Sequence, residues 1–234
     1  MAGVGIMGNV ARTVFLFDVD NTLLDNDAVQ EDLSEHLERE VGLASRDRYW
    51  EIFEQLRAEL GYADYLGALQ RYRLEHQDDQ QLLRISFFLL DYPFADRLYP
   101  GALAALEHCR TLGPTVILSD GDVVFQPRKV QRAGLCEAVE ERVLIYLHKE
   151  RMLSAVEQRY PAEHYVMIDD KLRILAVMKE AWGERLTTVF ARQGHYAHDP
   201  REIAAWPPAD VTLARIGELP AAADTLWRRA GLSG

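Results

Sequence analysis

Two aspartates directly follow a short apolar run near the N-terminus. Residues 14–17 are all apolar, Asp18 and Asp20 come next, and Asp25 and Asp27 follow soon after. Like charges this close repel one another, so the end of a buried strand tolerates them only where a cation or a protonated partner shares the site. We therefore expect a neutralising partner beside Asp18 and Asp20.

Side chains suited to phosphate or metal chemistry also lie at the ends of three later apolar runs. They are Ser119 and Asp120 (run 115–120), Lys149 (just after run 142–148), and Asp169 and Asp170 (run 164–170). Ligands of open α/β sheets bind at the carboxyl ends of the strands. The sequence therefore predicts that these side chains meet Asp18 at one edge of a sheet.

Short β-rich apolar runs alternate with helical segments in the second half of the chain. The runs are residues 13–18, 115–120, 142–148, 164–170, 186–192 and 209–213, and helical stretches cover 102–113, 149–160 and 172–183. Near-continuous apolar strands alternating with helices indicate a parallel sheet covered on both faces. We predict an α/β fold with a Rossmann-like parallel sheet sandwiched by helices.

The segment between the first and second strands has a different pattern. Residues 28–90 carry four apolar stripes at helical spacing, the second ended by Gly61 and the fourth by Pro93. This predicts an all-helical domain at 25–97, inserted into an α/β core formed by 1–24 and 98–234. We expect residues 1–11 to be a flexible tail.

The composition excludes several classes of protein. The 234 residues carry a formal net charge of −11, which disfavours binding to nucleic acid or to anionic membranes. The sequence has no apolar stretch long enough to span a membrane and only Cys109 and Cys136 as cysteines, and we expect no secretory signal. We expect a cytoplasmic protein with reduced thiols, a monomer or homodimer, with a small-molecule partner.

Taken together, these motifs resemble those of the haloacid dehalogenase-like superfamily, in particular its phosphatases. Residues 18–22, Asp-Val-Asp-Asn-Thr, match the first motif of that family, D-x-D-x-T. Ser119 matches the second motif, Lys149 the third, and the pair Asp169 and Asp170 the acidic fourth. The resemblance covers the chain from about residue 12, and the helical insertion looks like the family's cap inserted between the first and second motifs.

The resemblance implies a phosphomonoester hydrolase of a small phosphorylated metabolite. Asp18 is then the nucleophile that forms an aspartyl-phosphate, and Asp20 is the general acid and base. Ser119, Asp120 and Lys149 are the predicted phosphate-binding residues.

The resemblance also implies a Mg²⁺ cofactor. Its predicted ligands are Asp18, the backbone carbonyl of Asp20, and Asp169 and Asp170, an oxygen-only set that suits Mg²⁺. The chain departs from the family pattern at two places: Arg173 and Ile174 stand where a further Asp is frequent, and Glu150 replaces a frequent proline after Lys149.

Several alternatives stay open at the level of the sequence. Lys129 is a rival to Lys149 as the phosphate-binding lysine. The same fold also hosts 2-haloacid dehalogenases, in which Asp18 would attack carbon, although Asp20 argues against this because dehalogenases of the family typically lack that acid. A third reading is a capped domain that binds a partner without catalysis.

Three other patterns are weaker. Residues 3–8 match G-x-G-x-x-G but precede the first strand instead of following one, so no helix N-terminus is available for a pyrophosphate. His195 and His198 could ligate a metal, but the sequence offers no third partner. An arginine of the insertion could reach an anionic substrate; the candidates are Arg46, Arg48, Arg71 and Arg73.

Overall fold

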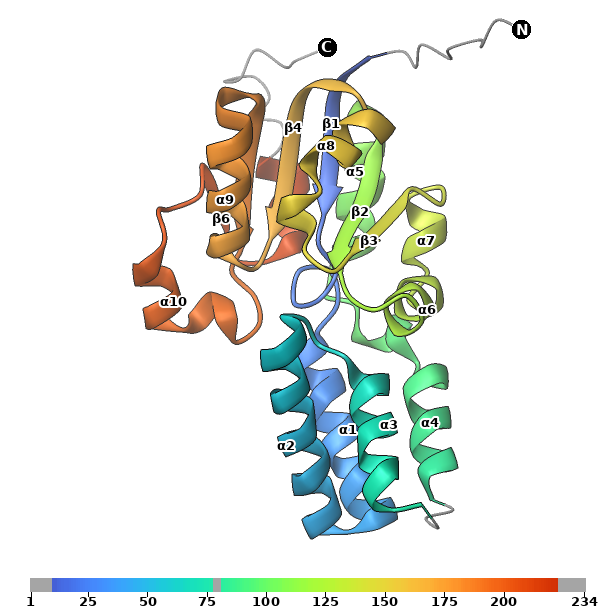
Figure 1. Cartoon of the computed structure of the whole chain (residues 1–234). Helices are drawn as coiled ribbons and strands as arrows, with labels where there is room; N and C mark the ends of the chain where they lie inside the picture. The colour runs from blue at the N-terminus through green and yellow to red at the C-terminus, as the bar shows by residue number, and fades with distance from the viewer. Residues whose placement is uncertain (1–9, 78–80, 223–234) are drawn as a thin grey trace, which may run out of the picture.

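The core of the protein is a six-stranded parallel sheet. The computed structural model describes residues 10–77 and 81–222, and the strand order is β3-β2-β1-β4-β5-β6 (Figure 1). The strands are β1 (Ala11–Phe17), β2 (Thr115–Asp120), β3 (Val143–Tyr146), β4 (Ala162–Asp169), β5 (Leu186–Ala191) and β6 (Val211–Leu213). All five strand pairs are parallel. The order is that of a doubly wound Rossmann-type sheet, which confirms the predicted fold class.

Alternate residues of each strand enter two separate apolar layers. Phe15 and Phe17 of β1 belong to the layer that includes α5 (Ala102–Leu112), α6 (Phe125–Arg132) and α7 (Leu135–Ala138). Val14 and Leu16 belong to the opposite layer, with α8 (Leu153–Arg159) and α9 (Leu172–Trp182). Successive side chains of a strand point to opposite faces, so a continuous apolar run such as β1 suits burial on both sides.

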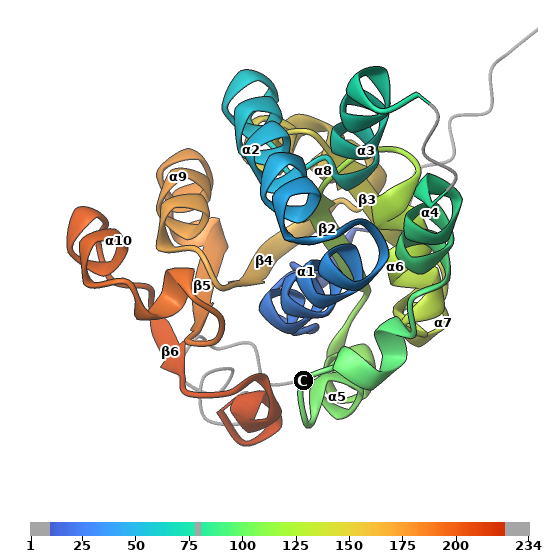
Figure 2. The same ribbon diagram turned by 90° about the horizontal axis from the view of Figure 1, so that it is seen from below.

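Four helices interrupt the core after its first strand. They are α1 (Asn26–Val41), α2 (Leu43–Leu60), α3 (Tyr65–Glu75) and α4 (Leu82–Asp91). They lie beyond the carboxyl ends of the strands, where Figure 2 views them end-on, and α4 contacts α6 of the core. A β-bridge joins Leu24 to Leu98, the two residues that flank the predicted insertion. We call residues 25–97 the helical insertion.

The remaining short elements mostly lie in the connections. They are the 3-10 turns η1 (Phe94–Arg97), η2 (Lys149–Arg151), η3 (Gly183–Arg185), η4 (Tyr196–His198) and η5 (Ile216–Glu218), and the helix α10 (Pro200–Ala205). The predicted helix 149–160 is therefore divided at Met152 into η2 and α8. Residues 1–9 of the predicted tail lie outside the described residues, and β1 begins at Ala11.

The structure also bears on the expected reduced thiols and on the expected absence of a membrane span. Cys109 and Cys136 are both free thiols, and burial raises the pKa of Cys109. Among residues 10–77 and 81–222, no helix is long and apolar enough to cross a membrane.

Candidate active site

Asp18 occupies the first position after β1 and is almost completely buried. Its backbone N–H donates to the carbonyl of Ile168 in β4 at 3.0 Å, so the sheet fixes the backbone up to this residue. The hydroxyls of Ser119 and Thr22 lie 3.4 Å from Oδ1 and Oδ2 of Asp18. The Nζ of Lys149 is 2.5 Å from Oδ1. Residues far apart in the sequence thus meet around one carboxylate.

Lys149 is the lysine that contacts Asp18. Its Nζ also lies 2.7 Å from Oδ2 of Asp169, and its side chain is 3% exposed. Burial alone would lower the pKa of Lys149, but the facing carboxylates of Asp169, Asp18 and Asp120 outweigh it and raise the pKa. The lysine therefore stays charged and supplies the compact positive charge that a phosphoryl group needs.

Asp120, a predicted phosphate-binding residue, contacts the backbone of Lys149. Its Oδ1 accepts a hydrogen bond from the backbone N–H of Lys149 at 2.7 Å, which fixes the start of η2. Burial raises the pKa of Asp120 to about 6, although nearby Lys149 opposes the shift. Its side chain thus positions the backbone that carries Lys149.

Three buried carboxylates form a group that could hold a metal ion. Asp18, Asp169 and Asp170 each offer an oxygen, and these oxygens lie within 4.8 Å of one another. Neither oxygen of Asp170 accepts a hydrogen bond from the described residues, although the side chain is fully buried. Burial, with the neighbouring Asp169 and Asp18, raises the pKa of Asp170 despite the opposing charge of Lys171. Buried acceptors without donors need a partner, and an oxygen-only set fits a hard divalent cation.

Asp20 lies beside this group, held by two residues of α6. Its Oδ1 is 2.7 Å from the Nζ of Lys129, and its Oδ2 is 3.4 Å from the Nε2 of Gln126. Gln126 also donates to the hydroxyl of Ser119 at 2.9 Å. The rival lysine of the sequence therefore pairs with Asp20, while Lys149 pairs with Asp18.

Sequence reasoning missed Gln126, and it named Lys129 only as a rival phosphate-binding lysine and not as a partner of Asp20. The two residues are three positions apart in a helix that starts shortly after β2, so they share a face. A helix that begins at the carboxyl end of a strand can direct that face toward the site, and this spacing is the signal that could have found them.

The two departures from the family pattern contact one another. Glu150, in η2, accepts from Arg173, in α9, at 3.1 Å, and the Glu150 side chain is 6% exposed. Arg173 therefore does not extend the acidic group; it ties the turn that carries Lys149 to the helix that follows Asp170.

The structure also places the alternative metal and anion candidates. The Nδ1 of His195 lies 2.6 Å from Oδ1 of Asp27, with both side chains partly exposed. Within residues 10–77 and 81–222, the only group of three or more acids, histidines or cysteines close enough to share an ion is Asp18, Asp169 and Asp170. His195 and His198 therefore do not form such a site there.

Three of the four candidate arginines form ion pairs on the surface of the helical insertion. Arg46, Arg48 and Arg71 pair with carboxylates of the insertion itself. Arg57, which the sequence did not single out, instead reaches the core: its guanidinium donates to the hydroxyl of Tyr196.

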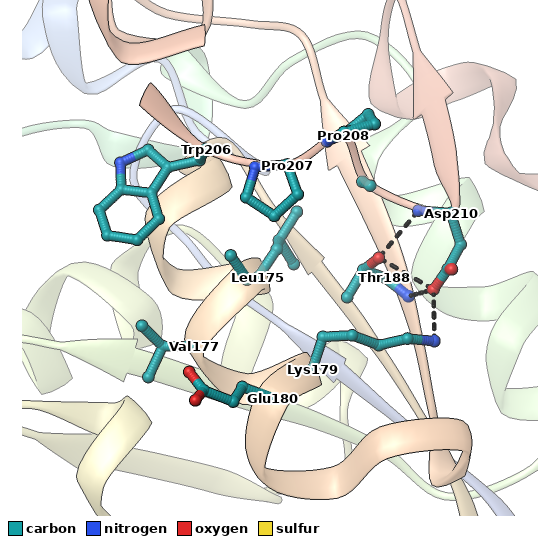
Figure 3. Close-up of a pocket in the computed structure, with 11 residues that line it drawn as sticks. Leu175, Val177, Lys179, Glu180, Thr188, Trp206, Pro207, Pro208 and Asp210 are labelled. Atoms are coloured by element: carbon teal, nitrogen blue, oxygen red, sulfur yellow. Dashed lines mark hydrogen bonds and ion pairs between the residues drawn. The ribbon is translucent and has the colours of Figure 1, made fainter. Parts of the chain in front are cut away.

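A cavity of about 410 Å³ lies away from these residues, between α9 and the segment that leads into β6. Figure 3 shows Trp206 and Pro207 on one side of it and the ion pair of Lys179 and Asp210 on the other. Asp210 also accepts from the backbone and hydroxyl of Thr188. None of the predicted site residues lines this cavity.

Comparison with known proteins gives the family. A family model described as haloacid dehalogenase-like hydrolase matches residues 13–181, which span β1, the helical insertion and the strands up to β4 with α9. The chain belongs to this family. The protein is therefore a haloacid dehalogenase-like hydrolase, as the motifs predicted, and an enzyme.

Solved structures of the same family match nearly the whole chain. A haloacid dehalogenase-like hydrolase from Burkholderia xenovorans LB400 is 67% identical with a TM-score of 0.89, covering 93% of this chain and 99% of that one. The magnesium-bound HAD-hydrolase YfnB from Bacillus subtilis is 17% identical with a TM-score of 0.60, covering 95% and 99%. The L-2-haloacid dehalogenase from Xanthobacter autotrophicus is 18% identical with a TM-score of 0.57, covering 92% and 99%. No curated protein matches the sequence. The two distant structures share the fold with this hydrolase.

Proposed function

We propose that this hydrolase is a Mg²⁺-dependent phosphomonoesterase that acts on a small phosphorylated metabolite. The observation that carries the proposal is the buried group of Asp18, Asp169 and Asp170, in which both Asp170 oxygens lack a donor among residues 10–77 and 81–222. Attack of a carboxylate on a carbon–halogen bond needs no cation, whereas phosphoryl transfer needs positive charge around the equatorial oxygens. When bound by these carboxylates, Mg²⁺ supplies part of that charge.

The residues around Asp18 have complementary roles in the proposed reaction. An oxygen of Asp18 bonds to phosphorus as the bond to the leaving oxygen breaks, and Asp20 gives that leaving oxygen a proton. Water then attacks phosphorus, Asp20 takes its proton, and the bond to Asp18 breaks to release phosphate. Ser119 and Lys149, both within 3.4 Å of Asp18 Oδ1, hold the phosphoryl oxygens.

We further propose that the helical insertion is a cap that closes over this site. Its position beyond the carboxyl ends of the strands supports this role, because a cap must cover the edge where Asp18 lies. A cytoplasmic location and a monomeric or homodimeric state remain predictions from the sequence.

The first test is Asp18→Asn with 4-nitrophenyl phosphate and Mg²⁺. Loss of the nucleophile should lower kcat by about 10⁴-fold or more. Asp210→Asn, which removes a carboxylate in the distant cavity, is the matched control and should retain wild-type kcat. Activity of Asp18→Asn within about tenfold of wild type would refute the role of Asp18.

Labelled water separates phosphatase from dehalogenase chemistry. When water attacks phosphorus, ¹⁸O from the solvent enters the released phosphate and not Asp18. When water attacks the carbonyl carbon of an ester at Asp18, as in dehalogenation, ¹⁸O enters the Asp18 carboxylate instead. Halide release in EDTA with label in Asp18, and no phosphate release from any monoester, would replace the proposed function with the dehalogenase alternative.

A further inference from the structure

Lys129 is a lysine with no exposed surface, placed where the core meets the helical insertion. Its side chain is 0% exposed, and its Nζ lies over the rings of Phe125 and Tyr65, 5.2 and 5.8 Å from their centroids. Lysine is almost never fully buried unless it is paired. Here the partners are Asp20 Oδ1 at 2.7 Å and Asn26 Oδ1 at 2.8 Å.

The two oxygens of Asp20 face different surroundings. Lys129 binds Oδ1 from the side of the aromatic rings and the insertion. Oδ2 is the oxygen within 3.4 Å of Gln126 Nε2, and the same Nε2 donates to Ser119 Oγ, which lies 3.4 Å from Asp18. Gln126 and Ser119 thus connect Oδ2 to the nucleophile, whereas Oδ1 is bound by Lys129.

We propose that Lys129 is a positioning residue that holds Asp20 with Oδ2 toward the nucleophile, and that Asn26 and Tyr65 make this orientation depend on the placement of the helical insertion. The inference rests on the proposed phosphatase function, in which Oδ2 donates the proton to the leaving oxygen as the Asp18–phosphorus bond forms. Lys129 itself touches neither substrate nor phosphorus.

The link to the insertion runs through a short chain of hydrogen bonds. Asn26, the first residue of α1, accepts from Lys129 and donates through Nδ2 to the Tyr65 hydroxyl at 3.2 Å. Tyr65 begins α3, and its hydroxyl also accepts from Gln30 at 2.8 Å. A shift of α1 or α3 would therefore change the partners that hold Lys129.

A purely structural role for Lys129 predicts equal losses of activity for every phosphate monoester, whereas a positioning role predicts losses that depend on the leaving group. Removing one partner of an ion pair is strongly destabilising only where the other charge is left buried and uncompensated. Methionine fills a similar volume, and Asp20 is 25% exposed and can be hydrated once the lysine is gone. Lys129→Met should therefore fold, and its effect should appear in the chemistry.

The test compares phosphate monoesters whose leaving groups differ in basicity. The ratio kcat/KM reports the steps up to transfer onto Asp18, and a basic leaving group needs its proton most. In Lys129→Met, kcat/KM should fall by less than about tenfold for 4-nitrophenyl phosphate and by about 10²–10³-fold for alkyl phosphates. Both substrates are measured on the same protein preparation, so the ratio of their kcat/KM values does not depend on how much of the variant is folded.

Two further variants complete the design. Lys179→Met removes a partly exposed lysine paired with Asp210 far from the site and should leave the leaving-group dependence unchanged. In an Asp20→Asn background, adding Lys129→Met should not make kcat/KM depend any more steeply on the basicity of the leaving group. If Lys129→Met is insoluble, Lys129→Gln replaces it, because its side chain is one bond shorter than lysine and stays polar. Lys129→Gln should show the same stronger dependence of kcat/KM on the basicity of the leaving group.

The outcomes separate this inference from the proposed function. One outcome is that the wild-type enzyme hydrolyses phosphate monoesters, while Lys129→Met and Lys129→Gln lower kcat/KM equally for all leaving groups. This result would overturn the role of Lys129 alone. The role of Lys129 would also be overturned if Lys129→Met and Asp20→Asn lowered kcat/KM additively in the double variant. Wild-type enzyme that hydrolyses no phosphate monoester would overturn the proposed function, and this inference with it.

Discussion

Asp170 shows how the candidate site differs from an ordinary buried ion pair. Lys149 lies within 2.7 Å of Asp18 and Asp169, but both Asp170 oxygens lack a donor among the described residues. Three buried carboxylates so close together repel one another, which is the cost anticipated from the sequence at the end of β1. A divalent cation would offset that cost and give the Asp170 oxygens a partner.

This residue provides a test of metal binding that is independent of activity. Burial beside Asp18 and Asp169 raises the pKa of Asp170, so this carboxyl destabilises the metal-free fold at neutral pH, and Asp170→Asn should raise the free energy of unfolding in EDTA by about 1–3 kcal/mol. Mg²⁺ at about 100 times its Kd should stabilise the wild type by about 2.7 kcal/mol and have a much smaller effect on the variant. Thermal unfolding with and without Mg²⁺ measures both effects, with Asp210→Asn as the control. Equal Mg²⁺ shifts in wild type and Asp170→Asn would contradict a metal site at this group.

At the scale of elements, one side chain joins the Asp18 loop to the helical insertion. Asn21 has a positive φ of 60°, and its Oδ1 accepts from the backbone N–H groups of Asn26 and Asp27 at 3.0 and 3.2 Å. Its Nδ2 donates to Asp27 at 2.9 Å. The first motif and the start of α1 are therefore held by the same asparagine.

Two substitutions separate the backbone and side-chain contributions of Asn21. Asn21→Gly keeps the left-handed conformation at low cost but loses the hydrogen bonds, and we expect a loss of about 1–2 kcal/mol. Asn21→Ala loses the same bonds and also strains the backbone, so it should be less stable than Asn21→Gly by about 1 kcal/mol. Urea unfolding of both variants measures the difference. An Asn21→Ala as stable as Asn21→Gly would show that the backbone conformation relaxes.

The strands and the residues at their ends were predictable because both follow from local sequence. A run such as 116–118 is apolar throughout, so it predicts a strand buried on both faces, and the residues that follow it, Ser119 and Asp120, fall at the edge of the sheet. The contacts of α6 were not predictable in this way. Whether Lys129 faces Asp20 or Asp18 depends on how α6 packs against the sheet and α4, and residue type alone does not specify that.

At the scale of the whole molecule, the helical insertion touches the core on the side of α9 through an aromatic contact. Arg57, in the last turn of α2, lies 5.8 Å from the centroid of the Tyr196 ring and bonds its hydroxyl. Lys171, the residue after Asp170, lies 5.0 Å from the same centroid. Tyr196 therefore contacts one cation of the insertion and one of the core, close to the acidic group. The sequence could not indicate this contact, because Arg57 and Tyr196 are 139 positions apart.

Arg57→Ala should weaken substrate binding without slowing the chemical step. A partly exposed cation–π contact with a hydrogen bond stabilises the closed arrangement by about 0.5–1 kcal/mol, which corresponds to a factor of about two to five in an equilibrium. If the insertion acts as the proposed cap, it separates from the core when substrate enters and product leaves, and loss of this contact lowers the fraction of molecules competent to bind. We therefore expect KM to rise about two- to fivefold while kcat stays within about twofold of wild type. Steady-state kinetics of Arg57→Ala measures this, with Arg71→Ala as the matched control, because Arg71 pairs with Glu59 on the surface of the insertion. A KM that rises equally in Arg71→Ala, or not at all in Arg57→Ala, would mean that the contact with Tyr196 does not control closure.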